Sequence, residues 1–407
     1  MSLRDKFISY RIEDGKFVRV INLFGYEIKR YYKKYLLNEK LCSKVGIKTL
    51  LFIRDDGIGD FIMNMPYIKY LKQSKKYHDY KIILAATQNI TDMAKKYLSE
   101  YIDSYILISK KNNVRLAEKC KKMSFTTLIN PVDAKVNYAA EIIAENVTAK
   151  EKICHFGYFS AEDSLSPKNK VPKVISKYTR IIETGKELML VKDRCKKFFE
   201  LLLDEKIPPV ETLKELEPVD LDMKSDYIIV SPFTRDKRRT YSADNFIKII
   251  DFITDELKVP VVLIGTKKER TDAVRIKEAC KNQDMIFNMT GLCSLSESIL
   301  YIKNAKMMVA NETGTVHIAQ NYGIRTICIS NGSYYGAFWP YPEEESHVTY
   351  VYPENLEEYL TANNLHGILS DYDIDKIDYK RVISTISEVW EEINTQQNKE
   401  LCHSGSV

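Results

Sequence analysis

The segment LLFIRDDGIGDFIMNMP, residues 50–66, decides how the first half of the chain folds. An apolar run ends in a turn that contains Gly57 and Gly59, and a second apolar run follows at helical spacing. A buried strand followed by a tight turn and a helix is the opening of an α/β unit. The two glycines permit the tight turn, and Asp60 falls at the predicted start of the helix.

This turn does not fit a redox dinucleotide site. Such a site has three glycines in the pattern G-x-G-x-x-G. Gly57 and Gly59 supply the first two, but Ile62 occupies the third position. Taken alone, the segment leaves two interpretations of Asp60 open: the N-cap of the helix, or a group that takes part in chemistry.

Strand-like and helix-like segments alternate along the chain in two series, the first from residue 47 and the second from residue 226. This alternation predicts βαβ units and mainly parallel sheets. A polar stretch and the linker KIPPVETLKELEPVD, residues 206–220, separate the series. Ligands of such folds bind at the carboxyl ends of the strands, so we expect two Rossmann-like domains whose sheets face each other across a cleft. The predicted boundaries are an N-terminal helical segment 1–46, a first domain 47–218, a second domain 219–345 and a helical tail 346–407 that packs back on the first domain.

The N-terminal stretch FGYEIKRYYKKYLLNEK, residues 24–40, mixes aromatic and basic residues at roughly helical spacing. We predict an amphipathic helix that packs on the first domain. A second interpretation is a basic, aromatic helix that touches an anionic membrane surface.

Composition excludes several classes of protein. The 407 residues carry 61 basic and 56 acidic side chains, for a net charge of +5, which is too balanced for nucleic acid as the main partner. The eight cysteines form no C-x-x-C pair, so we expect free thiols in a reducing compartment rather than a zinc site. The start lacks the apolar core of a signal peptide, and no apolar stretch approaches the ~20 residues of a membrane span. We therefore expect a cytoplasmic protein, with peripheral contact at the inner face of the membrane as a second possibility.

The segment NETGTVHIAQNYG, residues 311–323, follows a predicted strand and opens a short helix. Glu312, Thr313, Gly314 and Thr315 form the turn, and His317 lies in the first helical turn. The N–H groups of a helix N-terminus, two hydroxyls and the nearby His317 suit a diphosphate. A capped helix with His317 bonded into the core fits the same residues. Glu312 suits an anion site only if it binds a sugar hydroxyl or is neutralised by nearby cations.

A basic run, SPFTRDKRRTYSADNF at residues 231–246, follows the first strand of the second series. A solvated charge run is the usual explanation of such a segment. Here it lies at a carboxyl strand end, where a phosphate-bearing ligand would bind, and arginine can contact phosphate through two hydrogen bonds. The side chains in question are Thr234, Arg235, Lys237, Arg238 and Arg239.

Together these segments resemble glycosyltransferase family 9, the heptosyltransferase-like family. FIRDDGIGDFIMNMP resembles its first strand and Gly-Asp turn, RTYSADNF its basic element, and ETGTVHIA its D-[ST]-G-x-x-H-x-A motif. The segment NMTGLCSLSESILYIKNAKMMVANETG resembles its L-x-G-x-x-(S/T)-L-x-E stretch. The resemblance covers roughly residues 47–340. It departs from the family pattern at Arg239 in place of Lys, Glu312 in place of Asp and Tyr241 in place of Trp.

The resemblance implies a GT-B architecture and inverting, metal-independent sugar transfer without a cofactor. Asp60 matches the base that deprotonates the acceptor hydroxyl, and Arg239 matches the lysine that neutralises the donor phosphates. Thr234 matches a hydroxyl at the diphosphate, assisted by Lys237 or Arg238, and the loop of residues 312–317 matches the donor-phosphate loop. The implied donor is a nucleotide-diphosphate sugar, most often an ADP-sugar in this family. The implied acceptor is a bacterial surface glycan or its lipid-linked precursor.

Two other functions fit the same predicted fold. A nucleotide-sugar epimerase would turn over the donor without any acceptor, and a non-catalytic relative would bind nucleotide or glycan without transfer. A dehydrogenase is disfavoured by the missing third glycine.

Overall fold

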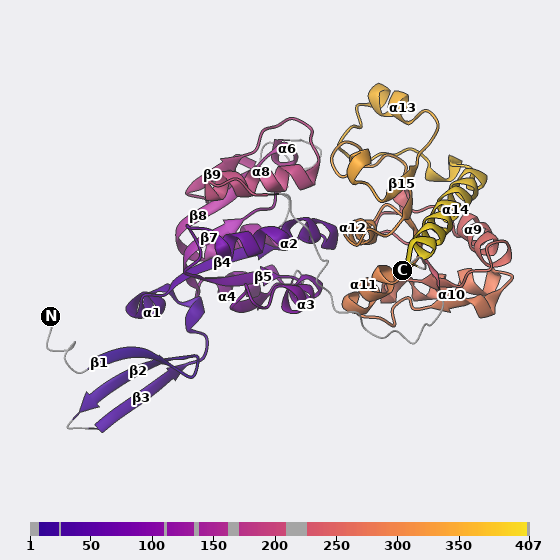
Figure 1. The fold of residues 1–407 in the computed structure, drawn as a ribbon. Helices are drawn as coiled ribbons and strands as arrows, with labels where there is room; N and C mark the ends of the chain where they lie inside the picture. Colours follow the sequence, from indigo (N-terminus) through magenta and orange to yellow (C-terminus); the bar gives the residue numbers. More distant parts are fainter. Residues whose placement is uncertain are drawn as a thin grey trace. The chain divides into compact units, whose positions relative to one another are not determined.

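The computed structural model describes residues 8–23, 26–109, 112–133, 138–161, 171–208 and 226–404. They form two compact units: the first holds the sheets β1–β3 and β4–β9, and the second holds the sheet β10–β15 (Figure 1). The expected alternation of strands and helices is present in both units. The predicted linker from residue 209 onward and the predicted boundary at residue 218 lie outside the described residues.

The first unit is built on a parallel six-stranded sheet in the order β6-β5-β4-β7-β8-β9. Its central strand is buried from Thr49 to Arg54, as expected for a parallel sheet covered on both faces. The strands are β4 (Lys48–Arg54), β5 (Tyr80–Ala86), β6 (Ser104–Leu107), β7 (Ser124–Asn130), β8 (Thr148–Phe156) and β9 (Arg180–Glu183). The helices are α1 (Glu39–Cys42), α2 (Ile58–Gln73), α3 (Gln88–Tyr97), α4 (Asn113–Cys120), α5 (Tyr138–Asn146), α6 (Tyr158–Ala161), α7 (Val171–Ile175) and α8 (Val191–Leu203).

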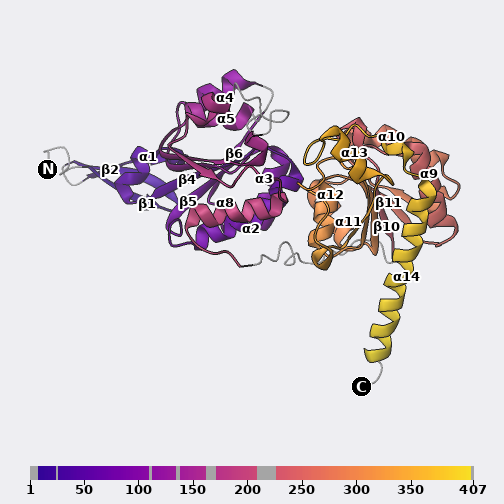
Figure 2. The same ribbon diagram turned by 90° about the horizontal axis from the view of Figure 1, so that it is seen from above.

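Helices cover both faces of this sheet. On one face, Leu116 of α4 and Ile143 of α5 join the strands in a single apolar cluster. On the other face, the ring of Phe199 in α8 lies 6.1 Å from Phe52 of β4 and stacks on Tyr67 of α2 at 4.8 Å. Figure 2 shows α4 and α5 on one side of the strands and α2 and α8 on the other.

The second unit has the same plan, with a parallel sheet in the order β12-β11-β10-β13-β14-β15. Helices α9, α10 and α14 pack on one face through side chains such as Phe246, Ile276 and Ile386. Figure 2 shows α11 and α12 on the opposite side of the strands. The strands are β10 (Ile228–Ser231), β11 (Val261–Leu263), β12 (Ile286–Asn288), β13 (Met307–Asn311), β14 (Thr326–Ile329) and β15 (Val348–Val351). The helices are α9 (Ala243–Asp255), α10 (Arg270–Ala279), α11 (Leu295–Lys303), α12 (Gly314–Asn321), α13 (Leu356–Asn363) and α14 (Tyr379–Ser404).

The strand order reverses once in each sheet, between β4 and β7 and between β10 and β13. Loops that leave the carboxyl ends of two such strands diverge to opposite faces, and ligands of open α/β sheets bind in the crevice that this creates. The turn with Asp60 follows β4, the basic run follows β10, and Glu312 follows β13. The two topologies therefore place each motif at a switch point of its own sheet.

The predicted N-terminal helix is wrong. The structure has an antiparallel meander of β1 (Ile8–Glu13), β2 (Lys16–Leu23) and β3 (Tyr26–Tyr32). Asp14 and Gly15 connect β1 to β2 with φ of 48° and 69°. A two-residue turn with both φ values positive matches the twist of a hairpin, and Asp-Gly is one of its preferred sequences.

The prediction that the C-terminal tail packs on the first domain is also wrong. Val382, Ile386, Val389 and Ile393 of α14 belong to the apolar core of the second unit. The tail also begins with β15, which extends the second sheet by pairing with β14. The second unit therefore continues well beyond the predicted end at residue 345.

Candidate functional site

Three loops meet at the carboxyl edge of the second sheet, because β10, β13 and β14 are neighbours. The loop after β10 carries the basic run and the short 3-10 helix Lys237–Arg239. The loop after β13 carries Glu312 and opens α12. The loop after β14 begins with Ser330 and Asn331, both of which are buried.

Arg239 and Glu312 form an ion pair that joins the first two loops. Arg239 Nη1 donates to Glu312 Oε1 at 3.3 Å, and Ser330 Oγ donates to Glu312 Oε2 at 2.6 Å. Glu312 is 1% exposed, and burial raises the pKa of its carboxyl group while the nearby Arg239 cation opposes that shift. The expectation that Glu312 needs a neutralising cation is thus met by Arg239.

Only one side of the Arg239 guanidinium is taken up by this ion pair. Its side chain keeps 21% of its surface exposed, and its Nε is buried without a hydrogen bond to any residue the structure describes. The guanidinium carbon also lies 5.7 Å from the ring centroid of Tyr334. A guanidinium held by a carboxylate and a ring, with donors left over, is suited to bind an anion.

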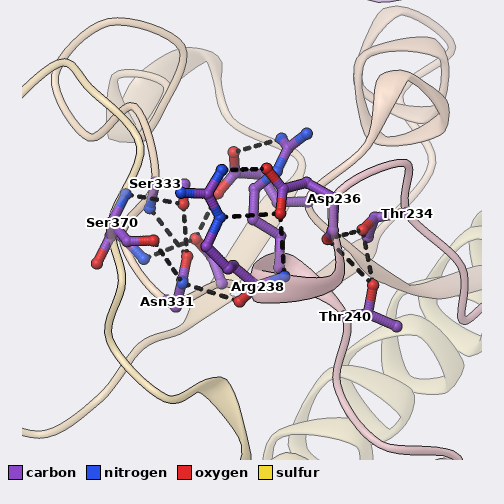
Figure 3. Close-up of polar contacts among 11 residues, drawn as sticks. Thr234, Asp236, Arg238, Thr240, Asn331, Ser333 and Ser370 are labelled. Atoms are coloured by element: carbon purple, nitrogen blue, oxygen red, sulfur yellow. Dashed lines mark hydrogen bonds and ion pairs between the residues drawn. The ribbon is translucent and has the colours of Figure 1, made fainter. Parts of the chain in front are cut away.

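The other cations of the run are placed differently from Arg239. Arg238 is exposed and donates from Nε and Nη2 to the two carboxylate oxygens of Asp236, at 3.0 and 2.7 Å (Figure 3). These bonds to Arg238 lower the pKa of Asp236 to about 2. Arg235 and Lys237 are exposed. The structure therefore separates one half-buried arginine, Arg239, from three surface cations.

The hydroxyl groups of Thr234 and Thr240 form hydrogen bonds within the loop that follows β10. Thr234 Oγ1 lies 2.7 Å from Thr240 Oγ1, and both hydroxyls reach the carbonyl oxygen of Asp236 (Figure 3). Thr234, predicted to contact the donor diphosphate, thus has its hydroxyl proton engaged within its own loop.

Asn331 holds this loop against the rest of the second unit through hydrogen bonds. The sequence analysis did not predict this residue. The side chain is fully buried, and its Nδ2 donates to the carbonyl oxygens of Arg238, Ser370 and Tyr372 at 3.0–3.3 Å. Its Oδ1 accepts from the backbone and side chain of Ser333 (Figure 3). The only signal in the sequence was an Asn-Gly-Ser turn directly after a strand.

The N-terminus of α12 presents backbone donors beside this ion pair. Thr313 is the N-cap residue, and its hydroxyl lies 2.6 Å from that of Thr315. Thr315 Oγ1 in turn lies 3.3 Å from Ser231 Oγ at the end of β10. The helical geometry leaves the N–H groups of Gly314 and Thr315 without intrahelical partners, and such groups favour an anion.

His317 is a buried residue of the aromatic core. Its ring stacks on Trp339 at 4.2 Å, and Nδ1 lies 2.6 Å from the hydroxyl of Tyr341. Burial lowers the pKa of His317 to about 3, so the imidazole is neutral at pH 7. The structure therefore places His317 as a support of α12 rather than as a cation.

After β4, the helix α2 begins at Ile58, so Asp60 is the third residue of the helix and lies in its first turn. The position before the helix belongs to Gly57, which rules out Asp60 as the N-cap residue. Gly59 lies inside the helix. A carboxylate in the first turn is favoured by the helix dipole.

A second acid of the first unit, Asp133, was not predicted. It follows β7 and accepts backbone N–H bonds from Gly157, Phe159 and Ser160 at 2.7–3.1 Å. Asp133 is 8% exposed and so acts as a buried anchor for the start of α6. Its only sequence signal was a position just after a strand.

Within the described ranges, no group of three or more His, Cys, Asp or Glu side chains could hold a metal ion. Nor does any helix in the described part of the chain have the length and apolar character to cross a membrane.

Comparison with known families gives one match, in which residues 157–358 fit the model of glycosyltransferase family 9 (heptosyltransferase). No curated protein sequence matches the chain.

Solved structures share the fold at low sequence identity. A glycosyltransferase family 9 protein from Veillonella parvula aligns with a TM-score of 0.61 and 14% identity, over 85% of this chain and 97% of the other. The E. coli heptosyltransferase WaaC with ADP-2-deoxy-2-fluoro heptose gives 0.60 and 13%, over 84% and 99%. The E. coli ADP-heptose lps heptosyltransferase II gives 0.59 and 13%, over 86% and 100%. The predicted α/β fold of two Rossmann-like domains, the GT-B architecture, is confirmed.

Proposed function

Residues 157–358 make the chain a member of glycosyltransferase family 9, and from that premise we propose that this glycosyltransferase moves a sugar from a nucleotide-diphosphate sugar to a glycan or glycolipid acceptor. The observation that carries the proposal is the pairing of Arg239 with buried Glu312 beside the N-terminus of α12. That arrangement offers a fixed cation and free backbone N–H groups to a diphosphate. Structures of the similar E. coli heptosyltransferase WaaC hold ADP-2-deoxy-2-fluoro heptose or ADP, and this favours an ADP-sugar as the donor.

The leaving diphosphate gains negative charge as the glycosidic bond breaks. Donors fixed before the reaction stabilise such charge because they need not reorganise. Arg239 supplies a cation held by Glu312, and the N–H groups of Gly314 and Thr315 supply the helix terminus. We propose that these groups neutralise the diphosphate without a metal ion, with Lys237 as an outer contact. Thr234 contacts the diphosphate in this proposal by turning its hydroxyl proton away from the carbonyl oxygen of Asp236.

The acceptor hydroxyl needs a base to take its proton as the new bond forms. We propose Asp60 for this role, since it stands at the switch point of the first sheet. Attack on the anomeric carbon from the side opposite the diphosphate inverts its configuration. The proton passes from the hydroxyl to the Asp60 carboxylate, and the nucleoside diphosphate leaves with the electron pair of the broken bond.

Two measurements test this function. A thermal-shift panel of ADP-, UDP- and GDP-sugars should show a higher melting temperature with the matched donor, because ligand binding stabilises the folded state. An NMR time course should then show release of nucleoside diphosphate only when acceptor is present, with an inverted anomeric configuration in the product. Turnover of the donor without acceptor would indicate an epimerase instead, and binding without turnover would indicate a non-catalytic protein.

A further inference from the structure

The N-terminal sheet β1–β3 has two faces of very different chemistry. Residues directly opposite each other in the register share a face. Ile8, Ile21 and Ile28 form one row across the three strands, and Tyr10, Arg19 and Arg30 form the next row of the same face. We call this the arginine face. Its described strand positions include no Asp or Glu.

On the opposite face, which we call the ion-pair face, basic side chains form ion pairs with neighbouring glutamates. Arg11 binds Glu13 at 2.6 Å and Glu27 at 3.0 Å, and Lys29 binds Glu13 at 3.0 Å. Arg11 and Lys29 thus each have a carboxylate partner.

The cations of the arginine face have no such partners. Arg19 and Arg30 lie directly opposite each other, an arrangement of like charges that is unfavourable without an anion. Neither forms an ion pair with any residue that the structure describes, and Arg19 Nε is buried without a hydrogen bond. Lys44 adds a third cation, with Nζ bonded to the Tyr10 hydroxyl at 2.8 Å and 4.1 Å from the ring centroid.

The arginine face is also apolar and only partly covered. One end is closed by Phe17, which is fully buried against Tyr10, Tyr32 and Tyr35. At the other end, Ile28 is 55% exposed and Tyr26 is 77% exposed. Exposed aliphatic and aromatic groups around unpaired cations point to a partner that is both anionic and apolar.

From this arrangement we propose that the arginine face of β1–β3 docks on an anionic lipid bilayer. A bilayer surface accepts isoleucine at the acyl boundary, tyrosine at the headgroup level and arginine at lipid phosphates. Nucleic acid offers no environment for the isoleucine row. A second copy related by a two-fold axis would place arginines against arginines.

The test uses the full chain and co-sedimentation with vesicles of phosphatidylcholine alone or mixed with phosphatidylglycerol. Binding should require phosphatidylglycerol and weaken with added salt. Arg30→Gln should lower the partition coefficient about fivefold, the change that ~1 kcal/mol per cation gives. Lys29→Gln is the matched control, because it removes one positive charge from the adjacent residue on the ion-pair face, and its binding should stay near wild type. Thermal melts confirm that both variants fold.

A second variant, Ile28→Ser, tests the apolar part and should also weaken binding to the mixed vesicles. The proposal is overturned if binding does not depend on phosphatidylglycerol, or if Arg30→Gln and Lys29→Gln lose binding equally. It is also overturned if a duplex DNA fragment displaces the vesicles from the arginine face. A dimer in sedimentation equilibrium that dissociates in the Arg30→Gln protein would likewise overturn it in favour of a second copy.

Discussion

Arg239 Nη1 lies 3.3 Å from Glu312 Oε1, across the carboxyl ends of the adjacent strands β10 and β13. The resemblance to family 9 implies an aspartate at the position of Glu312 and a lysine at that of Arg239, so both partners of the pair depart from the expected pattern. The longer carboxylate reaches Ser330 as well as Arg239. The pair thus fixes the direction of the guanidinium before any ligand binds.

Separate replacements of Arg239 and Arg238 distinguish the contributions of these two side chains to nucleotide binding. Arg239→Ala should weaken ADP binding by at least about tenfold, the loss of one charge-assisted hydrogen bond. Arg238→Ala is the control, because that side chain is exposed and engaged by Asp236, and its ADP affinity should change less than about twofold. Isothermal titration of both variants measures the difference. Equal losses in the two variants would contradict the special position of Arg239.

The buried amide of Asn331 holds the loop of Arg238 and Arg239 in place. Asn331→Asp should destabilise the protein by ~3 kcal/mol, because three carbonyl oxygens lose a buried donor. Trypsin should also cleave faster after Lys237, Arg238 or Arg239. Asn363→Asp on α13 is the matched control, since its Nδ2 makes one exposed bond to the carbonyl of Tyr359. Unchanged cleavage in Asn331→Asp would show that the loop is held by other contacts.

The buried imidazole of His317 predicts a pH dependence of stability. Its pKa falls from 6.5 in the unfolded chain to about 3 when folded, so the unfolded state binds more protons between these values. This contribution to stability is complete above pH 6.5 and is lost as the pH falls toward 3, by at most about 1.4 kcal/mol per pH unit. Urea unfolding from pH 4 to pH 8 should show a shallower slope for His317→Gln than for wild type.

Much of the fold could be predicted from local sequence. Buried strands such as β4 and amphipathic helices such as α9 have strong and distinct periodicities, and their alternation predicts parallel sheets. The motifs after β4, β10 and β13 were located because strand ends carry ligand contacts in such folds. In the observed strand order, each of these three motifs lies at a switch point of its sheet or beside one.

Other features depend on partners that are distant in sequence. Tyr26, Ile28 and Arg30 are two residues apart and share one face of a strand, whereas the helix was predicted from the rough spacing of aromatic and basic residues along the whole segment; the Asp14-Gly15 turn was the missed signal. The burial of His317 depends on Trp339 and Tyr341. Asn331 holds the basic loop because its amide donates to the carbonyl oxygens of Arg238 and Ser370. Both partners are distant in sequence, so the residue type of Asn331 alone could not reveal this contact.

The most direct test of the proposed reaction is the turnover of Asp60→Asn with a matched nucleotide sugar and acceptor. Asparagine keeps the shape of the side chain and cannot accept the proton, so turnover should fall by about 10²-fold or more, the usual contribution of a general base. ADP affinity should stay unchanged, which would confirm that the donor site is intact. Turnover near the wild-type value in a folded Asp60→Asn protein would contradict the assignment of Asp60 as the base.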